Sequence, residues 1–360
     1  MHINTALTWS WLNVLTKKRY DALISVFGNL DDALSAIDES LLKSLGCREE
    51  TIFKTLNRLE EFDVDWYTQQ LHKRGITLIS IEDDEYPNAL RSLPDPPIFL
   101  SYIGSLNILK QPCIALVGTR DISLYGKMVT EEFTNAFVKS GIVTVSGLAR
   151  GIDTEVAKET IKAGGKTVAV LGHGLPLITP VESKRLSEEI VKNGGLLLSE
   201  YPLDASADKY TFPARNRIIA GLCLVTVVLE AGKGSGALIT ADLAVDYGRD
   251  AYAVPGQIFE DTYLGCHTSI ARNMTKIACN PNAVLQDIGI ISNTKQNFVH
   301  YEPKDETEKT LLQTLTTMPQ STGDIVEKSA LSPSSINATL TMLELQGVAK
   351  NVGNGQWVKK

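Results

Sequence analysis

Short apolar runs alternate with longer amphipathic stretches through the middle of the chain. The runs lie at residues 113–117, 142–145, 167–171, 196–198 and 224–229. Between them, stretches such as residues 126–139 and 153–163 space their apolar positions as a helix does. Buried parallel strands joined by crossover helices are typical of this pattern. It predicts an α/β domain, in which ligands bind beyond the carboxyl ends of the strands.

The first 75 residues show a different pattern, in which short helices are separated by glycine-containing turns. Apolar positions recur at helical spacing before Gly28 and again before Gly46. We expect a small helical domain over residues 1–75, of the sterile-alpha-motif or helix-hairpin-helix kind, that packs against its neighbour. The predicted buried face is Ala22, Leu23, Val26 and Phe27 in the first stretch, and Leu41, Leu42 and Leu45 in the second.

Helical spacing returns near the C-terminus, after a polar stretch that predicts a linker over residues 290–304. Ser321 and Ser332 stand where helix N-caps are expected, and a Gly-Asn-Gly turn follows. Three helices and a β-turn predict a winged-helix domain over residues 305–360. Its near-neutral charge favours protein contacts or an accessory role. The expected apolar face is Leu340, Leu343, Leu345 and Val348.

Composition describes an ordinary globular protein, since 43% of the 360 residues are hydrophobic and 21% are charged. No apolar run is long enough for a membrane helix, and no secretory leader is visible. The five cysteines form no CxxC pair, so neither a zinc site nor a disulfide framework is expected. We therefore expect a cytoplasmic protein with no metal, no cofactor and no membrane partner.

The net charge of −7 argues at first against nucleic acid. The acidity is concentrated in the N-terminal part, because residues 1–109 hold 10 Lys and Arg against 16 Asp and Glu. Residues 110–289 hold 18 against 19. A local basic groove in the middle region is therefore compatible with the overall charge.

Two of the predicted strands lead into turns that suit a phosphate. After the first, Gly118 lets a ligand approach the backbone, and Arg120 can fork onto a phosphate near a helix N-terminus. After the second, Ser146 and Gly147 can donate hydrogen bonds, and Asp153 is expected to cap the next helix. Each turn taken alone is also compatible with a plain strand-to-helix connection.

The turn Gly172-His173-Gly174 has only the first two glycines of a dinucleotide fingerprint, because Leu177 occupies the third position. It also follows a late strand, so a nicotinamide or flavin site is not supported. His173 is interpreted as a polar turn residue rather than a general base.

The densest cluster of candidate ligand groups is residues 212–217, which hold one aromatic ring, two guanidinium groups and an amide. Phe212 offers a face on which an unpaired base can stack, and Arg215 and Arg217 suit phosphate oxygens. Asn216 lies between the two arginines, and Lys209 adds a cation just before the cluster. A solvated helix entry is the alternative interpretation of this cluster.

A further glycine-rich turn, residues 230–240, follows the last apolar run. Lys233 can lie along a phosphate backbone, and Ser235 with Gly236 can donate hydrogen bonds at the next helix start. The Gly-Lys-Ser/Thr ending of a P-loop is absent, so ATP hydrolysis is not implied.

In this order, these segments resemble the DNA-processing protein A family, also called Smf, from about residue 10 to the C-terminus. The most specific matches are Val117-Gly118-x-Arg120 with Ser123-x-Tyr125-Gly126, Ser146-Gly147-x-Ala149-x-Gly151-Ile152-Asp153, Phe212-Pro213-x-Arg215-Asn216-Arg217 continuing to Leu222, and Ser235-Gly236-x-Leu238-Ile239-Thr240 with Ala253-Val254-Pro255-Gly256 after it.

The resemblance implies an extended Rossmann-like domain, over residues 76–289, that binds single-stranded DNA regardless of sequence and has no catalytic residues. It also implies a homodimer that protects incoming DNA and loads the RecA recombinase during natural transformation or recombination. Carried over by position, the DNA contacts are Arg120, Lys209, Phe212 and Lys233, accompanied by Gly118, Ser146, Gly147, Arg215, Asn216, Arg217, Ser235 and Gly236. One of the two arginines could instead pair with Glu200 or Glu230.

The chain departs from the family pattern in two places. Thr179-Pro180 stands where the family usually has Tyr-Pro. Ser269-Ile270 and Asn273-Met274 replace a Leu-Ile and Gly-Ala tendency near the family's dimer surface, which leaves the dimer geometry open.

Two other function classes compete with DNA binding. A nucleotide-processing enzyme of the phosphoribohydrolase type could use Glu200 or Glu230 on a ribose, but the Pro-Gly-Gly-x-Gly-Thr signature of such enzymes is absent. A winged-helix transcription regulator is disfavoured by the near-neutral C-terminal region.

Overall fold

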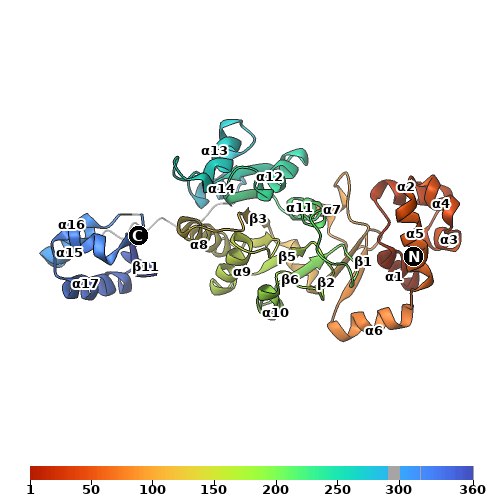
Figure 1. The fold of residues 1–360 in the computed structure, drawn as a ribbon, viewed down its shortest axis with the longest axis horizontal. Helices are drawn as coiled ribbons and strands as arrows, with labels where there is room; N and C mark the ends of the chain where they lie inside the picture. Colours follow the sequence, from red (N-terminus) through yellow and green to blue (C-terminus); the bar gives the residue numbers. More distant parts are fainter. Residues whose placement is uncertain (291–300, 317, 360) are drawn as a thin grey trace. The chain divides into compact units, whose positions relative to one another are not determined.

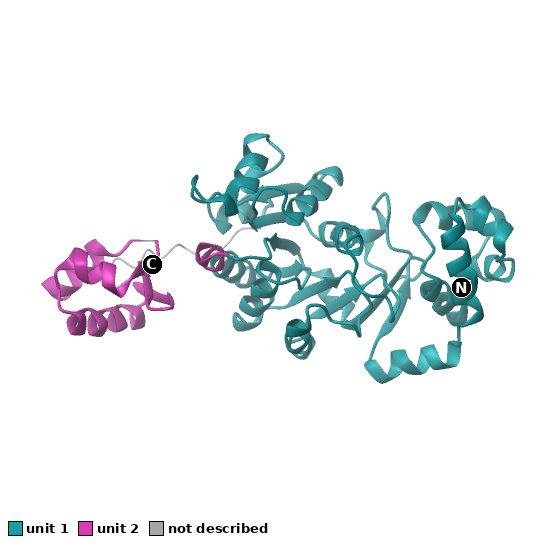
Figure 2. Cartoon of the chain, in the orientation of Figure 1, with its two compact units in different colours: residues 1–122, 130–290 teal, residues 123–129, 291–360 magenta. Residues whose placement is uncertain are grey.

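The computed structural model describes residues 1–290, 301–316 and 318–359, which fall into two compact units (Figure 2). The first comprises residues 1–122 and 130–290, and the second residues 123–129 and 291–360. Most of the predicted linker, residues 291–300, lies outside the described residues.

The N-terminal part of the first unit is a module of short helices (Figure 1), called the helical module below. Side-chain oxygens of Thr16, Asn29, Asp38 and Asp63 accept a backbone N–H at the start of four of them, which explains where these helices begin. The helices are α1 Ile3–Leu12, α2 Lys17–Phe27, α3 Leu30–Ser35, α4 Glu39–Ser44, α5 Glu49–Glu60 and α6 Val64–Arg74.

The predicted apolar face of α2 is wrong in part. Leu23 is buried, but Ala22 is exposed and Val26 has 73% of its surface exposed. The buried stripe passes through Leu23, Ile24 and Phe27, so it is rotated away from Val26. In the next stretch Leu42 is fully buried, whereas Leu41 and Leu45 are half-buried.

A nine-stranded sheet forms the centre of the first unit, with the order β1-β2-β6-β5-β4-β3-β7-β8-β9. The strands β3 to β9 are mutually parallel, while β2 is antiparallel to β6 and β1 to β2. The five apolar runs are β3 to β7, as predicted. The strands are β1 Thr77–Ser80, β2 Phe99–Gly104, β3 Cys113–Gly118, β4 Val143–Ser146, β5 Thr167–Leu171, β6 Leu196–Ser199, β7 Val225–Glu230, β8 Asp250–Ala253 and β9 Lys276–Ile277.

Helices cover both faces of this sheet, with α9 and α10 on one side and α11 and α12 on the other (Figure 1). This doubly wound arrangement is the predicted Rossmann-like fold. The helices are α7 Asn88–Arg91, α8 Leu124–Lys139, α9 Ile152–Lys162, α10 Lys184–Lys192, α11 Thr211–Leu222, α12 Gly236–Asp246, α13 Leu264–Ala271 and α14 Pro281–Asp287, with single 3-10 turns η1 Leu106–Lys110, η2 Val181–Ser183 and η3 Asp261–Tyr263.

The direction of winding reverses at β3. From β3 the chain adds β4, β5 and β6 toward one edge, and it then returns to add β7, β8 and β9 on the other side. The adjacent strands β3 and β7 therefore send their chains to opposite faces, which opens a crevice at their carboxyl ends.

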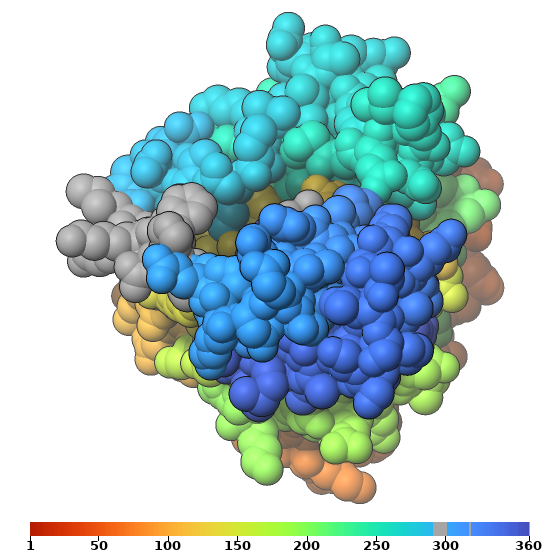
Figure 3. Space-filling model, turned by 90° about the vertical axis from the view of Figure 1, so that its left-hand side faces the viewer, coloured from red at the N-terminus to blue at the C-terminus, as the bar shows by residue number. Residues whose placement is uncertain are grey.

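Residues 301–316 and 318–359 form a winged helix with its own hydrophobic core, drawn in blue in Figure 3. Ser321 caps its second helix in a capping box with Asp324, and Ser332 caps the third, as predicted. Leu340, Leu343 and Val348 are buried, but Leu345 has 79% of its surface exposed and does not belong to the predicted face. The elements are α15 Glu306–Thr314, β10 Gln320–Ser321, α16 Thr322–Ser329, α17 Pro333–Leu345, β11 Ala349–Gly353 and β12 Gln356–Lys359.

Candidate nucleic-acid interface

A pocket of about 750 Å³ opens at the carboxyl ends of β3 and β7, where the winding reverses. We call it the switch pocket. Three segments line most of it: residues 117–121 at the end of β3, residues 207–219 around the start of α11, and residues 232–240 at the start of α12. Of the predicted site residues, its wall contains Gly118, Arg120, Lys209, Phe212, Arg215, Asn216, Lys233, Ser235 and Gly236.

Arg120 is held at the rim by the backbone of its own turn. The N–H of Thr119 donates to the carbonyl oxygen of Glu230 at 2.8 Å, and its carbonyl oxygen accepts from Ile152 N–H at 3.0 Å. Gly151 has a φ of +89°, and a Cβ there would stand 2.3 Å from the Thr119 oxygen, so only glycine fits this close approach. The turn is therefore fixed between β7 and α9, and the exposed Arg120 side chain extends from a rigid base.

The ring of Phe212 lies beside Arg120, with the guanidinium carbon 5.2 Å from the ring centroid. Phe212 is half-buried at the start of α11, so part of its ring remains accessible. Lys209 is exposed on the same approach to α11, with its ammonium 4.9 Å from the centroid of Tyr210. A cation beside a partly open aromatic face is the arrangement that stacks a base while contacting its phosphate.

The opposite wall is the start of α12. Ser235 is its N-cap, since its hydroxyl oxygen accepts from Ala237 N–H, and the side-chain amide of Asn216 donates to the carbonyl oxygen of Gly236 at 3.3 Å. Lys233 stands exposed one turn earlier. A helix N-terminus and a nearby ammonium both favour an anionic ligand.

The pocket wall carries a small excess of positive charge, since it holds Arg120, Lys209, Arg215 and Lys233 against Asp121, Asp153 and Asp208. Asp121 pairs with Arg150, and the Asp208 carboxylate accepts from Tyr210 N–H at 2.8 Å. Within the described part of the chain, none of the ion pairs involves Arg120, Lys209 or Lys233.

Arg215 reaches the pocket floor but is a buried structural residue, only 4% exposed. Its guanidinium donates to the Val170 carbonyl oxygen at 2.5 Å and occupies space that a Cβ on Gly147 would fill, 1.6 Å from Nη1. Burial raises the pKa of Asp153, and the charge of Arg215 opposes that shift. Arg215 therefore places a positive charge near a buried carboxylate of the pocket wall.

Asp153 does not cap α9, contrary to the prediction. The helix begins at Ile152 with Gly151 as its N-cap residue, and Asp153 is the second helical residue. Its carboxylate turns back to accept from Gly147 N–H at 3.1 Å and Ala149 N–H at 3.4 Å. It therefore orders the preceding turn instead of the helix end.

Ser146, Gly147 and Arg217 are not brought to the pocket wall. The Ser146 hydroxyl donates to the Leu116 carbonyl oxygen at 2.7 Å, and the Gly147 N–H is used by Asp153. Arg217 forms ion pairs with Glu200 and, at 3.6 Å, with Asp95. The Ser146 hydroxyl, the Gly147 N–H, and Nε and Nη2 of Arg217 are thus engaged within the protein, and the suggested pairing of one arginine with Glu200 is present.

His173 is a buried turn residue, 1% exposed. Its Nε2 accepts from Thr179 N–H at 3.3 Å, and its Nδ1 lies 3.0 Å from the Gly174 carbonyl oxygen. Burial is the main cause that lowers the pKa of this imidazole. It holds its own loop together and lies outside the switch pocket.

Sequence reasoning missed three residues that build the site. Thr119 fixes the Arg120 turn through its backbone, and nothing in its side chain signals this. Asp208 and Thr211 close the turn before α11, with the Asp208 N–H donating to the Thr211 hydroxyl at 3.0 Å. The Asp-x-x-Thr spacing is a turn signal that could have been found.

The residues that depart from the family pattern after α13 begins adopt local structure of their own. Ser269 is buried on α13, where its hydroxyl accepts from Thr275 at 3.0 Å. Asn273 follows the helix with a φ of +56°, and Met274 has 43% of its surface exposed. Across the described residues, the side chains include no His, Cys, Asp and Glu group suited to a metal ion, and no helix is long and apolar enough to cross a membrane.

Two family models match the chain. The one described as DNA recombination-mediator protein A matches residues 77–289, and the one described as DprA winged helix domain matches residues 300–355. Protein Smf of Synechocystis is 30% identical over 379 residues, covering 95% of this chain and 95% of that protein. DNA processing protein DprA of Streptococcus pneumoniae is 41% identical over 222 residues, covering 62% of this chain and 77% of that protein.

Solved structures agree with the sequence comparisons. DNA processing protein A of Streptococcus pneumoniae superimposes with a TM-score of 0.67 at 35% identity, covering 79% of this chain and 98% of that one. DNA processing protein A of Helicobacter pylori, studied for its single-stranded DNA binding mode, has a TM-score of 0.53 at 30% identity, covering 59% of this chain and 96% of that one.

Proposed function

The chain belongs to the DNA recombination-mediator protein A family, and from that premise we propose that it binds single-stranded DNA, without sequence preference, in the switch pocket. The observation that carries the proposal is the set of three exposed rim cations around a partly open phenylalanine ring. Cations supply a salt-dependent attraction for any phosphate backbone, and an aromatic face stacks with any base. The single-stranded DNA binding of the Helicobacter pylori relative supports the same ligand.

The proposal extends to the role of the complex in the cell. The protein acts as a homodimer that protects incoming DNA and loads RecA during natural transformation or recombination, in the cytoplasm and without catalysis of its own. The family description as a recombination mediator supports this role. If the protein mediates loading, RecA nucleates faster on single strands that already carry this protein than on bare strands. The rate of RecA-dependent ATP hydrolysis on a precoated strand measures this nucleation.

The phosphoribohydrolase alternative is not favoured. Glu200 is engaged by Arg217, and Glu230 is fully buried at the end of β7. Neither carboxylate lines the switch pocket, so neither is placed to act on a ribose bound there.

The test is fluorescence anisotropy with labelled oligo-dT and with a matched duplex, titrated at several salt concentrations. The variant is Arg120→Ala/Lys233→Ala. The matched control is Arg185→Ala/Lys192→Ala, which removes the same charge from the exposed face of α10. We expect tighter binding of the single strand than of the duplex, and a shallower salt dependence for the pocket variant alone.

Two results would contradict the proposal. Absence of oligo-dT binding by the wild type at low salt would refute the ligand. Equal losses in the pocket and control variants would show that general charge, rather than this pocket, attracts the DNA.

A further inference from the structure

The segment between β6 and α11, residues 200–210, carries Lys209 and leads directly into Phe212. We call it the approach loop. Its last residues are held in a turn by Asp208 and Thr211, and its first by the Glu200 pair with Arg217. The part between these ends has no regular secondary structure, so its position depends on individual contacts rather than on a helix or strand.

The helical module reaches this loop through one arginine. Arg58, on α5, donates from Nη1 and Nη2 to the two carboxylate oxygens of Asp204, at 2.9 and 3.0 Å. Only 17% of the Arg58 side chain is exposed, against 44% of Asp204. A paired fork of this kind fixes both distance and orientation.

Arg58 is also held in place by contacts within the helical module. Its Nε and Nη2 donate to the Trp11 carbonyl oxygen at 3.0 and 2.7 Å, and its guanidinium carbon lies 4.0 Å from the Trp11 ring centroid. The Trp11 indole N–H donates back to the Arg58 carbonyl oxygen at 3.0 Å. All three guanidinium nitrogens are engaged, so the side chain cannot follow a displaced loop without losing these bonds.

The neighbouring residues of the loop are anchored to the same module and to the sheet. Leu203 is 7% exposed and belongs to an apolar cluster that contains Leu7, Tyr67 and Leu71 of the module. The Ala205 carbonyl oxygen accepts from Gly174 N–H at 2.8 Å. Residues 203–205 are thus held on both sides, four to six residues before Lys209.

We propose that Arg58 is a positioning residue for DNA binding: through Asp204 it holds the approach loop so that Lys209 and Phe212 face the switch pocket. The inference rests on the proposed function. Without the paired Arg58–Asp204 contact, the loop has to be ordered when DNA binds. The entropic cost of ordering it makes the binding free energy less favourable. We expect affinity for oligo-dT to fall about twofold to tenfold.

The experiment compares oligo-dT with an abasic strand of equal length, because their ratio of affinities isolates base stacking from phosphate contact. The variants are Arg58→Ala and Asp204→Asn, each also made in a Phe212→Ala background. Asp204 is in an exposed loop, so its variant keeps the inference testable if Arg58→Ala folds poorly.

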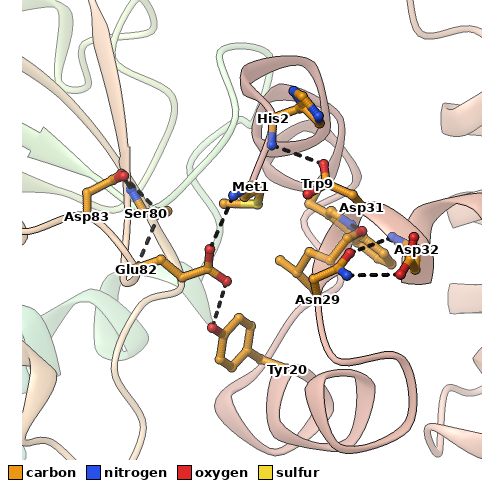
Figure 4. Close-up of polar contacts among 11 residues, drawn as sticks. Met1, His2, Trp9, Tyr20, Asn29, Asp31, Asp32, Ser80, Glu82 and Asp83 are labelled. Carbon is orange, nitrogen blue, oxygen red and sulfur yellow. Dashed lines mark hydrogen bonds and ion pairs between the residues drawn. The ribbon is translucent and has the colours of Figure 1, made fainter.

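Two controls match the chemistry. Arg74→Ala removes an arginine of the same module whose guanidinium bonds only Gln70 among the described residues. Glu82→Gln weakens a different attachment of the module, where the carboxylate accepts from Tyr20 at 2.9 Å (Figure 4). The melting temperature of every variant is measured alongside, since a purely structural role changes stability but not the dT-to-abasic ratio.

We expect Arg58→Ala and Asp204→Asn to lower the ratio of oligo-dT affinity to abasic-strand affinity. In the Phe212→Ala background, neither substitution should change this ratio further. Both controls should keep the wild-type ratio. Wild-type ratios in the two variants would overturn the positioning role and leave DNA binding standing. A wild type that binds no oligo-dT would overturn both.

Discussion

At the scale of single residues, burial decides what an arginine does in this site. Arg120 and Arg215 both line the switch pocket. Arg120 is exposed and belongs to no ion pair within the described chain, so its charge is available to a ligand. Arg215 is 4% exposed, and its charge interacts with the buried Asp153 carboxylate inside the protein rather than with a ligand. The sequence motif places both side chains but does not distinguish these roles.

Arg215→Ala is expected to lower the free energy of unfolding by about 3–5 kcal/mol, because it leaves the Asp153 carboxylate buried without a counter-charge. Urea denaturation followed by circular dichroism measures this loss. Arg120→Ala serves as the control and should stay within about 0.5 kcal/mol of wild type. Similar stability of the two variants would contradict the structural role of Arg215.

Phe212→Ala is expected to weaken oligo-dT binding by about 1–3 kcal/mol through lost stacking. Its affinity for an abasic strand should change little, because the rim cations remain. Anisotropy with the two strands separates these effects. An unchanged affinity for oligo-dT would remove Phe212 from the site.

At the scale of elements, the pattern of apolar runs predicts those strands that are buried on both faces. Strands β3 to β7 are largely apolar runs, and each lies within two residues of its predicted position. Strands β1, β8 and β9 lie at or near the sheet edges. They are short or mix polar with apolar residues, so no apolar run predicts them. Val26 and Leu345 are predicted to be buried but are exposed, because the spacing of apolar residues alone does not say which stripe of a helix packs against a neighbour.

The turn around His173 gives the protein a pH dependence of stability. Burial lowers the folded-state pKa of His173 below 6.5, so the unfolded chain binds the proton more readily. Its contribution to stability is therefore complete above that value and is lost as the pH falls below it. Melting temperatures measured between about pH 7.5 and about pH 5.5 should fall less steeply for His173→Gln than for wild type. Parallel curves would contradict this.

We expect the third helix of the winged-helix domain not to contact a phosphate backbone. Helix α17 has no Lys or Arg over Pro333–Leu345, and its exposed side includes Asn337, Thr341 and Met342. Helices that enter a DNA groove are normally flanked by cations on the phosphates. Asn337→Glu/Thr341→Glu should therefore leave duplex affinity of the full chain within about twofold of wild type. A larger loss in an anisotropy titration would place duplex DNA on α17.

At the scale of the whole molecule, the two units have separate hydrophobic cores, and the switch pocket belongs to the first. The location of the pocket could be predicted, because glycine-rich turns follow parallel strands whose carboxyl ends lie at the same end of the sheet. The internal use of Ser146, Gly147 and Arg217 could not be, since it depends on contacts between distant segments.

Removal of residues 291–360 is expected to leave the affinity for oligo-dT within about twofold of the full chain, because every residue lining the pocket lies outside them. Parallel anisotropy titrations of the two proteins measure this. A loss of tenfold or more in the shortened protein would show that the winged-helix domain contributes to the single-strand site.

The most direct test of the account is amide hydrogen exchange of the full chain with and without oligo-dT, followed by mass spectrometry. We predict slower exchange in residues 118–121, 207–212 and 232–237, which line or approach the switch pocket, and no change in α10. Slower exchange confined to residues 301–359, with the pocket segments unchanged, would contradict the central claim.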